Sequence, residues 1–292
     1  MANQKKIIFR LALLHLLLVA CFDFSLIFQK REIQDAENLN TRSASYYVTH
    51  SFFSRSIKSS QHSNSKVLFV GDSYAQDFMN ALLAEQILDL QNIDTIHISA
   101  ACGINFDPAE FVESIPAVHR QNCISKGGLS RFEYLLKNYE LLFLASKWEA
   151  WHIDELEEVI LRLEPSETKR IIIVGSKYLI KPDLRMLSGR GRGKLDADLG
   201  VSLQNGPRYA KQNELRLKEL ARKIEGVHYV NIAKYFEANG SNETIKNSSL
   251  LTFDGYHLTK AGAKYLGRKI KSDHVLPCTD LGQVLVQCGK DR

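Results

Sequence analysis

Short strand-like segments, several of them apolar throughout, alternate with segments of helical periodicity along most of this chain, and this alternation limits the possible folds more than any other feature. The predicted strands are residues 67–70, 94–99, 140–146, 169–176 and 228–232. The predicted helices are residues 73–90, 129–138, 153–163, 208–224 and 259–271. Strands without polar alternation are typical of a parallel sheet that helices cover on both faces. The sequence therefore predicts an α/β fold with a functional site at the carboxyl ends of the strands.

The chain of 292 residues divides into four predicted parts. These are an N-terminal membrane anchor or signal segment at 1–30, a polar stalk or linker at 31–65, a folded domain at 66–275, and a C-terminal tail at 276–292. With 45% hydrophobic and 24% charged residues, the composition is that of a globular protein and excludes a low-complexity or disordered chain. A net charge of +5 is too diffuse to indicate a nucleic-acid partner.

The N-terminal segment determines the expected compartment. Lys5 and Lys6 precede an apolar run at residues 7–28, which as a helix would be about 33 Å long and could cross a bilayer. We expect a retained single-pass anchor in a bacterial cell membrane, with a periplasmic folded domain. A cleaved signal peptide and a lipoprotein with its lipid on Cys21, after a lipobox-like sequence, are the alternatives. All three place the folded domain outside the cytoplasm.

Four of the five cysteines form two pairs with short separations. Cys102 and Cys123 flank one loop, and Cys278 and Cys288 flank another near the C-terminus. In an oxidising compartment these spacings predict the local disulfides Cys102–Cys123 and Cys278–Cys288, and neither spacing fits a zinc ribbon. Unpaired buried thiols are the alternative.

The sequence Val70-Gly71-Asp72-Ser73 lies where the first predicted strand meets the first predicted helix. A serine at this junction lies at a helix N-terminus, where free N–H groups and the helix dipole stabilise developing negative charge. Ser73 is therefore a candidate nucleophile, with its own N–H as an oxyanion donor. The simpler alternative is that Asp72 or Ser73 only caps the helix.

Asp254 and His257 lie three residues apart, just before the last predicted helix. At this spacing the carboxylate can hold the imidazole Nδ1–H while Nε2 faces a nucleophile. Each motif alone is common, as a helix cap or a polar loop. The two together, near the start and the end of one α/β domain, indicate a catalytic triad of Ser73, His257 and Asp254.

With these two motifs the chain resembles the SGNH/GDSL superfamily of esterases and acyltransferases, over residues 66–271. LFVGDSYAQDF matches the first motif of the family and FDGYHLTKAGAKYLG matches the fifth. The resemblance implies that Ser73 is the nucleophile and that Asp254 and His257 complete the triad. It also implies a three-layer α/β/α sandwich with a parallel sheet.

The two middle motifs depart from the family pattern. The second motif supplies a glycine N–H to the oxyanion, and Gly103 is the matching residue in this chain. The third motif normally contains an asparagine, often as GxND, whereas this chain reads LFLASKWEAWHID. Lys147, or the indole N–H of Trp148 or Trp151, is the candidate replacement donor. Packing against neighbouring helices is the alternative for both tryptophans.

The A-S-K-W ending of the third strand resembles the SGNH domains attached to acyltransferase-3 membrane proteins. That resemblance implies O-acylation, usually O-acetylation, of a cell-surface polysaccharide. It also implies a glycan acceptor and a separately encoded polytopic membrane acyltransferase as partners. An esterase with the same triad and a non-catalytic glycan-binding module are the alternatives. No cofactor is expected.

Three other features indicate no further site. Ser176 follows a strand but has no acid–base pair of its own, so a turn is the simpler interpretation. The GRGRGK sequence in the predicted loop 181–207 lacks the spacing of a phosphate-binding loop. His152 lies among carboxylates, but an acidic first helical turn explains these without a metal.

Overall fold

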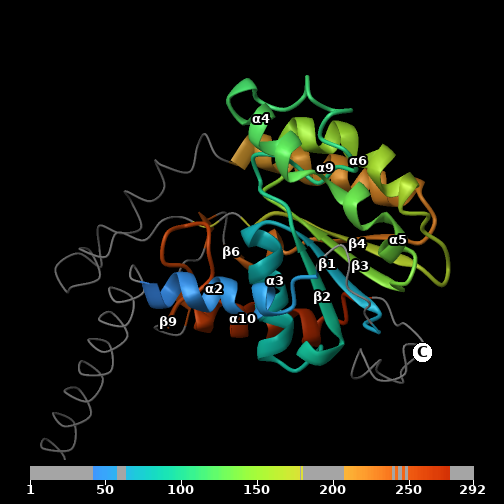
Figure 1. Cartoon of the computed structure of the whole chain (residues 1–292). Helices are drawn as coiled ribbons and strands as arrows, with labels where there is room; N and C mark the ends of the chain where they lie inside the picture. The colour runs from blue at the N-terminus through green and yellow to red at the C-terminus, as the bar shows by residue number, and fades with distance from the viewer. Residues whose placement is uncertain are drawn as a thin grey trace, which may run out of the picture.

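A five-stranded parallel sheet, in the order β2-β1-β3-β4-β5, forms the middle layer of the domain (Figure 1). The computed structural model describes residues 42–57, 64–177, 179, 207–238, 241–242, 245–246 and 249–276. The strands are β1 (Val67–Gly71), β2 (Ile93–His97), β3 (Leu141–Ala145), β4 (Arg170–Val174) and β5 (Val227–Val230). Helices lie on both faces of the sheet, so the predicted α/β/α sandwich is confirmed.

The carboxyl ends of the three strands β2, β1 and β3 are level. Gly71, the last residue of β1, pairs with His97 of β2 and with Ala145 of β3. Its φ is +147°, and a Cβ at this position would lie 1.8 Å from the carbonyl oxygen of Ala145. Only glycine fits between these strands. The strand ends therefore meet at one edge of the sheet, and Asp72 and Ser73 follow directly there.

Three helices cover one face of the sheet, and their core is rich in aromatic rings. They are α2 (Arg42–Ser54), α3 (Ser73–Ala84) and α10 (Lys260–Ser272). Phe69 stacks on Phe143 with ring centroids 4.4 Å apart, and Phe78 of α3 lies 5.8 Å from Phe143. All three rings are fully buried. This packing fixes α3, and with it the position of Ser73, against the sheet.

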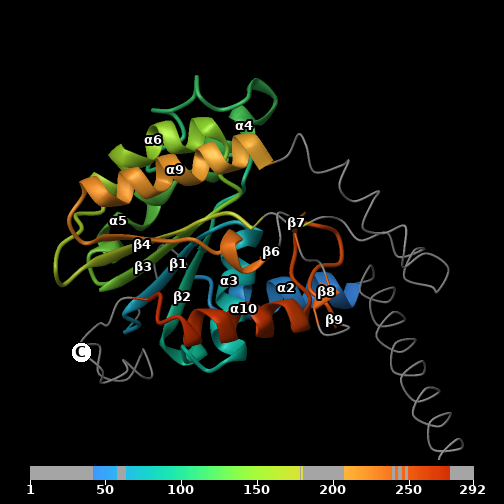
Figure 2. The same ribbon diagram turned by 180° about the vertical axis from the view of Figure 1, so that it is seen from behind.

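The opposite face is covered by a second group of helices (Figure 2). They are α4 (Ala117–Lys126), α5 (Glu133–Leu136), α6 (Ala150–Arg162) and α9 (Pro207–Lys223). Leu142 and Leu144 of β3 point into this second core, together with Leu156 of α6 and Leu217 of α9. The central strands β1 and β3 are therefore buried on both faces, which explains their unbroken hydrophobic sequences.

Shorter elements complete the described part of the chain. They are the 3-10 turns η1 (Leu90–Asn92), η2 (Leu129–Phe132) and η3 (Ala233–Tyr235), and the short strands β6 (Glu237–Ala238), β7 (Ser241–Asn242), β8 (Ile245–Lys246) and β9 (Ser249–Leu250). β6 pairs with β7, and β8 pairs with β9, both in antiparallel fashion.

Helix α2 lies within the segment that the sequence assigned to a linker. Val48 and Phe52 of α2 are buried, and Asn80 of α3 donates from Nδ2 to the carbonyl of Val48 at 3.2 Å. The folded domain therefore begins at α2, earlier than residue 66. Likewise, α4 forms where no helix was predicted, and the predicted helix 129–138 is instead η2 followed by the single turn of α5.

Several predicted features lie outside the described residues. These are the apolar run 7–28 with Cys21, the pair Cys278 and Cys288, and most of the loop 181–207. Among the helices that the structure does describe, none has the length and apolar character needed to cross a membrane.

Candidate active site

Asp72 connects the end of β1 to the end of β3. Its Oδ1 accepts a hydrogen bond from Tyr74 N at 2.8 Å and so caps α3. Its Oδ2 accepts two more, from Ser146 Oγ at 2.7 Å and from Lys147 N at 2.9 Å. Asp72 is therefore the helix cap, and two hydrogen bonds anchor it to the residues directly after β3. Ser73 is left as the first residue of α3, at the positive end of the helix dipole.

Asp254 holds the imidazole of His257 in a fixed orientation. Asp254 Oδ2 lies 2.6 Å from His257 Nδ1. Asp254 Oδ1 accepts backbone hydrogen bonds from His257 N at 2.7 Å and from Tyr256 N at 2.8 Å. Burial raises the pKa of Asp254, but the hydrogen bonds from His257 and Tyr256 outweigh it and lower the pKa to about 2. The carboxylate is thus ionised at neutral pH and can accept a hydrogen bond from His257 Nδ1, which leaves Nε2 as the ring nitrogen that Asp254 does not engage.

The segment around His257 is stiffened by further contacts. Thr252 Oγ1 donates to the carbonyl of His257 at 2.7 Å and accepts from Gly255 N at 2.9 Å. Phe253 stacks on the imidazole with centroids 5.8 Å apart. The ring of His257 is therefore held both at its edge and at its face.

The His257 segment lies against the face of α3 that carries Ser73. Asp77 follows Ser73 by one helical turn, so both side chains project from the same face of α3. Asp77 Oδ2 accepts a hydrogen bond from Leu258 N at 3.1 Å, and Leu258 directly follows His257. Near the end of β3, Lys147 Nζ lies 6.0 Å from the ring centroid of Tyr256. The His257 segment thus contacts α3 one helical turn after Ser73, and Lys147 near the end of β3 approaches the same segment.

Gly103 lies in a tightly fixed loop after β2. Its φ is +67°, and a Cβ there would lie 2.7 Å from His152 Cδ2. Asn105 donates from Nδ2 to the carbonyls of Cys102 at 2.8 Å and Gly103 at 3.0 Å. A disulfide joins Cys102 to Cys123 near the end of α4. Both the left-handed backbone and the lack of space explain why residue 103 is glycine.

The end of β3 shows which of the candidate donors are available. The indole of Trp148 is buried in the core and donates from Nε1 to the carbonyl of Val174 at 2.7 Å, so this donor is already used. Trp151 lies edge-on to His152 at 3.9 Å between ring centroids. Lys147 is half exposed and pairs with Glu149 at 3.1 Å. Of these side chains, Lys147 is the one that remains at the open edge of the site.

Three residues of this region were not among the predicted site residues. His152 is buried, and burial lowers its pKa to about 4, so it is neutral at physiological pH. Asp77 and Lys177 form an ion pair at 2.9 Å in which each side chain is 1% exposed. An aspartate on the apolar face of the predicted helix 73–90 was the one sequence signal for this pair.

Ser176 lies in the irregular segment directly after β4. It is buried, and its N–H donates to Glu214 Oε1 at 2.8 Å. Burial raises the pKa of Glu214 to about 7.

In the part of the chain that the structure describes, no group of three or more His, Cys, Asp or Glu side chains is arranged to hold a metal ion.

Comparison with known proteins identifies the domain type. Residues 43–272 match the family described as "SGNH domain (fused to AT3 domains)". No curated protein sequence matches the chain.

The solved structures that are similar to the chain include two acetyltransferase domains of low identity. One is the periplasmic domain of a lipopolysaccharide acetyltransferase from Salmonella ser. Paratyphi A, with 16% identity, a TM-score of 0.46, and coverage of 73% of this chain and 85% of that chain. The other is the C-terminal catalytic domain of peptidoglycan O-acetyltransferase A from Streptococcus pneumoniae, which carries a methylsulfonyl adduct. Its identity is 13%, its TM-score is 0.36, and the match covers 71% of this chain and 91% of that chain.

Proposed function

Because the chain belongs to the family of SGNH domains that occur fused to AT3 domains, we propose that it is a serine O-acyltransferase acting on a cell-surface polysaccharide. The observation that carries the proposal is the 2.6 Å contact between Asp254 and His257, in a segment held against the face of α3 that begins with Ser73. The transferred group is an acyl group, most simply acetyl. The acceptor is a sugar hydroxyl.

The reaction takes place in two steps. In the first, Ser73 Oγ attacks the acyl carbonyl while His257 Nε2 accepts the hydroxyl proton. The tetrahedral intermediate then collapses, and His257 returns the proton to the leaving group of the donor. In the second, a sugar hydroxyl loses its proton to His257 and attacks the acyl-serine, which releases the O-acylated sugar and restores Ser73. Asp254 stays ionised throughout and stabilises the imidazolium.

The oxyanion is bound by donors at the N-terminus of α3 and in the loop after β2. We assign Ser73 N and Gly103 N to this role, with the ammonium of Lys147 as the third donor in place of the family asparagine. Trp148 is not included, because its indole N–H already donates to Val174. Such donors are worth about 10²–10³-fold in rate each.

We further propose that the domain works outside the cytoplasm, attached to the membrane by residues 7–28 or by a lipid on Cys21. The Cys102–Cys123 disulfide supports this compartment, because disulfides persist where the surroundings are oxidising. A separate polytopic membrane acyltransferase would then deliver the acyl group to Ser73. The family description, which names a fusion to AT3 domains, supports such a partner.

The acyl-serine is the intermediate to detect. The full-length chain, purified in detergent, is incubated with a small acetyl ester, and its intact mass is measured. We expect one acetyl group on the wild-type chain, no acetyl group on Ser73→Ala, and an unchanged adduct on Ser176→Ala, the matched serine after β4. Absence of the wild-type adduct, even with a serine-reactive phosphonate, would leave the glycan-binding module as the better function.

The same preparation separates a transferase from an esterase. Asp254 and His257 have side chains 29% exposed, so water reaches the edge of the site. A transferase consumes the acyl-serine faster when oligosaccharide is added and forms an acylated sugar. An esterase turns over at the same rate with and without sugar, and only acetate is released.

A further inference from the structure

A buried ion pair lies directly behind the proposed triad. Lys177 Nζ is 2.9 Å from Asp77 Oδ2, and each side chain is only 1% exposed. Asp77 comes from α3, and Lys177 follows β4, so the pair joins a helix to the sheet. Charged side chains of this kind are seldom fully buried unless they are paired.

The pair contacts both reactive segments. Asp77 Oδ2 also accepts from Leu258 N, the backbone group directly after His257. Lys177 Nζ lies 3.5 Å from the ring centroid of Tyr74, the residue directly after Ser73. Asp77 Oδ2 therefore links the His257 segment to α3, the helix that begins with Ser73. The ammonium group of Lys177 contacts the same helix through the ring of Tyr74.

Stability alone does not explain the pair. Buried ion pairs often contribute no more to stability than apolar side chains of similar volume, because both ions lose their hydration. An apolar pair, however, would leave Leu258 N without an acceptor.

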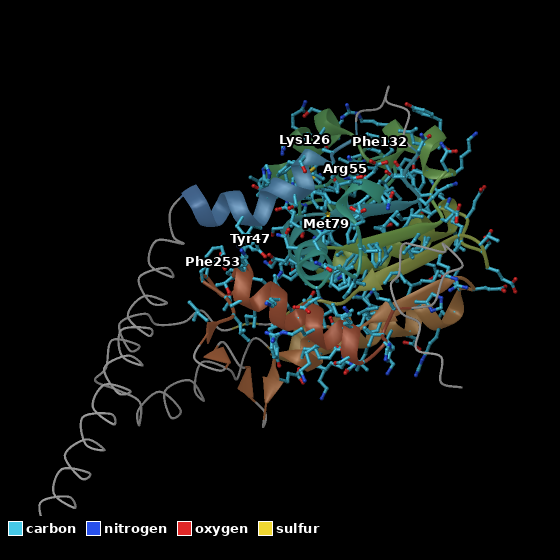
Figure 3. The ribbon with its side chains drawn as sticks, turned by 90° about the horizontal axis from the view of Figure 1, so that it is seen from below. Tyr47, Arg55, Met79, Lys126, Phe132 and Phe253 are labelled. Atoms are coloured by element: carbon cyan, nitrogen blue, oxygen red, sulfur yellow. A yellow bond between two sulfur atoms is a disulfide. The ribbon has the colours of Figure 1, made fainter. Side chains whose placement is uncertain are left out.

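Besides Lys177, the ionisable groups that interact electrostatically with Asp77 are His257 and Tyr47 of α2. Figure 3 shows Tyr47 on the same side of the domain as Phe253 of the His257 segment.

We propose that Asp77 is a positioning residue for His257 and that Lys177 is the counter-ion that keeps its buried carboxylate in place. The inference rests on the proposed function of the triad. The hydrogen bond to Leu258 N sets how far His257 Nε2 lies from Ser73 Oγ. A displacement of about 1 Å between reacting groups can cost about 10²-fold in rate.

Two double variants separate positioning from stability. Asp77→Leu/Lys177→Met removes both charges and the acceptor for Leu258 N. Asp77→Asn/Lys177→Met also removes both charges, but its amide oxygen still accepts from Leu258 N. The Leu variant leaves the buried Leu258 N without an acceptor, so we expect it to unfold at a lower temperature than the Asn variant. Labelling is therefore compared at a temperature at which both variants are folded.

The readouts are the rate of Ser73 labelling and the exchange of the Leu258 amide. A fluorophosphonate labels Ser73 by forming a bond from Oγ to phosphorus and releasing fluoride, while His257 takes the hydroxyl proton. In the full-length chain we expect the Asn variant to label at close to the wild-type rate. We expect the Leu variant to label about 10²-fold more slowly and to lose hydrogen-exchange protection at Leu258.

The outcomes decide between the proposals. If the Leu variant loses protection at Leu258 but labels at the wild-type rate, positioning by Asp77 is wrong. Equal loss of labelling in both double variants would also overturn it, because the charge and not the acceptor would then matter. A wild-type chain that does not label at all refutes the proposed function, and the positioning role with it, whatever the exchange at Leu258 shows.

Discussion

Replacing Asp254 with asparagine tests the proposed triad while changing its geometry little. The asparagine side chain would keep an oxygen that accepts from His257 N and Tyr256 N, as Asp254 Oδ1 does. Its amide nitrogen would face His257 Nδ1 in place of the carboxylate oxygen now 2.6 Å away. An amide nitrogen donates, so Nδ1 would become the acceptor and the ring proton would move to Nε2. His257 could then no longer accept the proton of Ser73.

The expected loss follows from this change of tautomer. In a serine triad the aspartate-to-asparagine change lowers the rate by about 10⁴-fold, because the imidazole has the wrong tautomer. At 1.36 kcal/mol per tenfold, this corresponds to about 5 kcal/mol of lost transition-state stabilisation. The fold should lose much less, about 1–2 kcal/mol, because Asp254 is partly exposed to solvent.

Fluorophosphonate labelling of Ser73 and urea unfolding measure the two quantities on one preparation. The matched control is Asp89→Asn, an exposed aspartate that also accepts from a nearby backbone N–H, that of Gln91 at 3.0 Å. The control should label like the wild type. If Asp254→Asn labels within about tenfold of the wild type, a difference of only 1.4 kcal/mol, His257 does not act as the base and the triad assignment is refuted. A variant that is unfolded in the urea experiment would instead show that Asp254 is structural.

Three further results are expected. Gly71→Ala should lose about 3 kcal/mol of stability or more, because the added Cβ would lie 1.8 Å from Ala145 O. Urea unfolding followed by circular dichroism measures this loss, and a variant as stable as the wild type would contradict the prediction. Lys177→Met should lose about 3–5 kcal/mol of stability, because the buried carboxyl group of Asp77 would lose its counter-ion. Lys147→Met, which removes a partner from an exposed pair, should lose under about 1 kcal/mol. Equal losses in the two variants would show that burial of the pair is not the cause. The pKa of Asp254 is lowered from 3.8 to about 2, so its ionised form stabilises the fold fully above about pH 4 and ceases to do so as pH falls through 2. The stability difference between wild type and Asp254→Asn should shrink over that interval, and a constant difference down to pH 2 would exclude this cause.

Local patterns in the sequence were sufficient to predict most of the sheet. Strands β1 and β3 are short and apolar throughout because both of their faces are buried, and this signal does not depend on distant residues. The contact between Asp254 and His257 is local as well, since three residues in one turn determine it. The departure of the third motif was also visible, as a strand ending without asparagine.

Features that depend on tertiary contacts could not be predicted. Helix α2 is rich in Ser, Thr and Tyr, which have modest helix propensity, and it is held by the burial of Phe52 and by Asn80. The role of Trp148 depends on a carbonyl of the neighbouring strand β4. The pair of Asp77 and Lys177 joins residues far apart in the sequence, so no spacing rule could have related them.

The Cys102–Cys123 disulfide has a consequence for how the chain responds to proteases. The segment that it closes includes Gly103 and most of α4. A single backbone cut inside this ring would leave both halves of the protein covalently joined. Such a nicked molecule would migrate as one band on a non-reducing gel and as two bands after reduction. A protease could therefore cut the chain once in this segment without releasing any part of it.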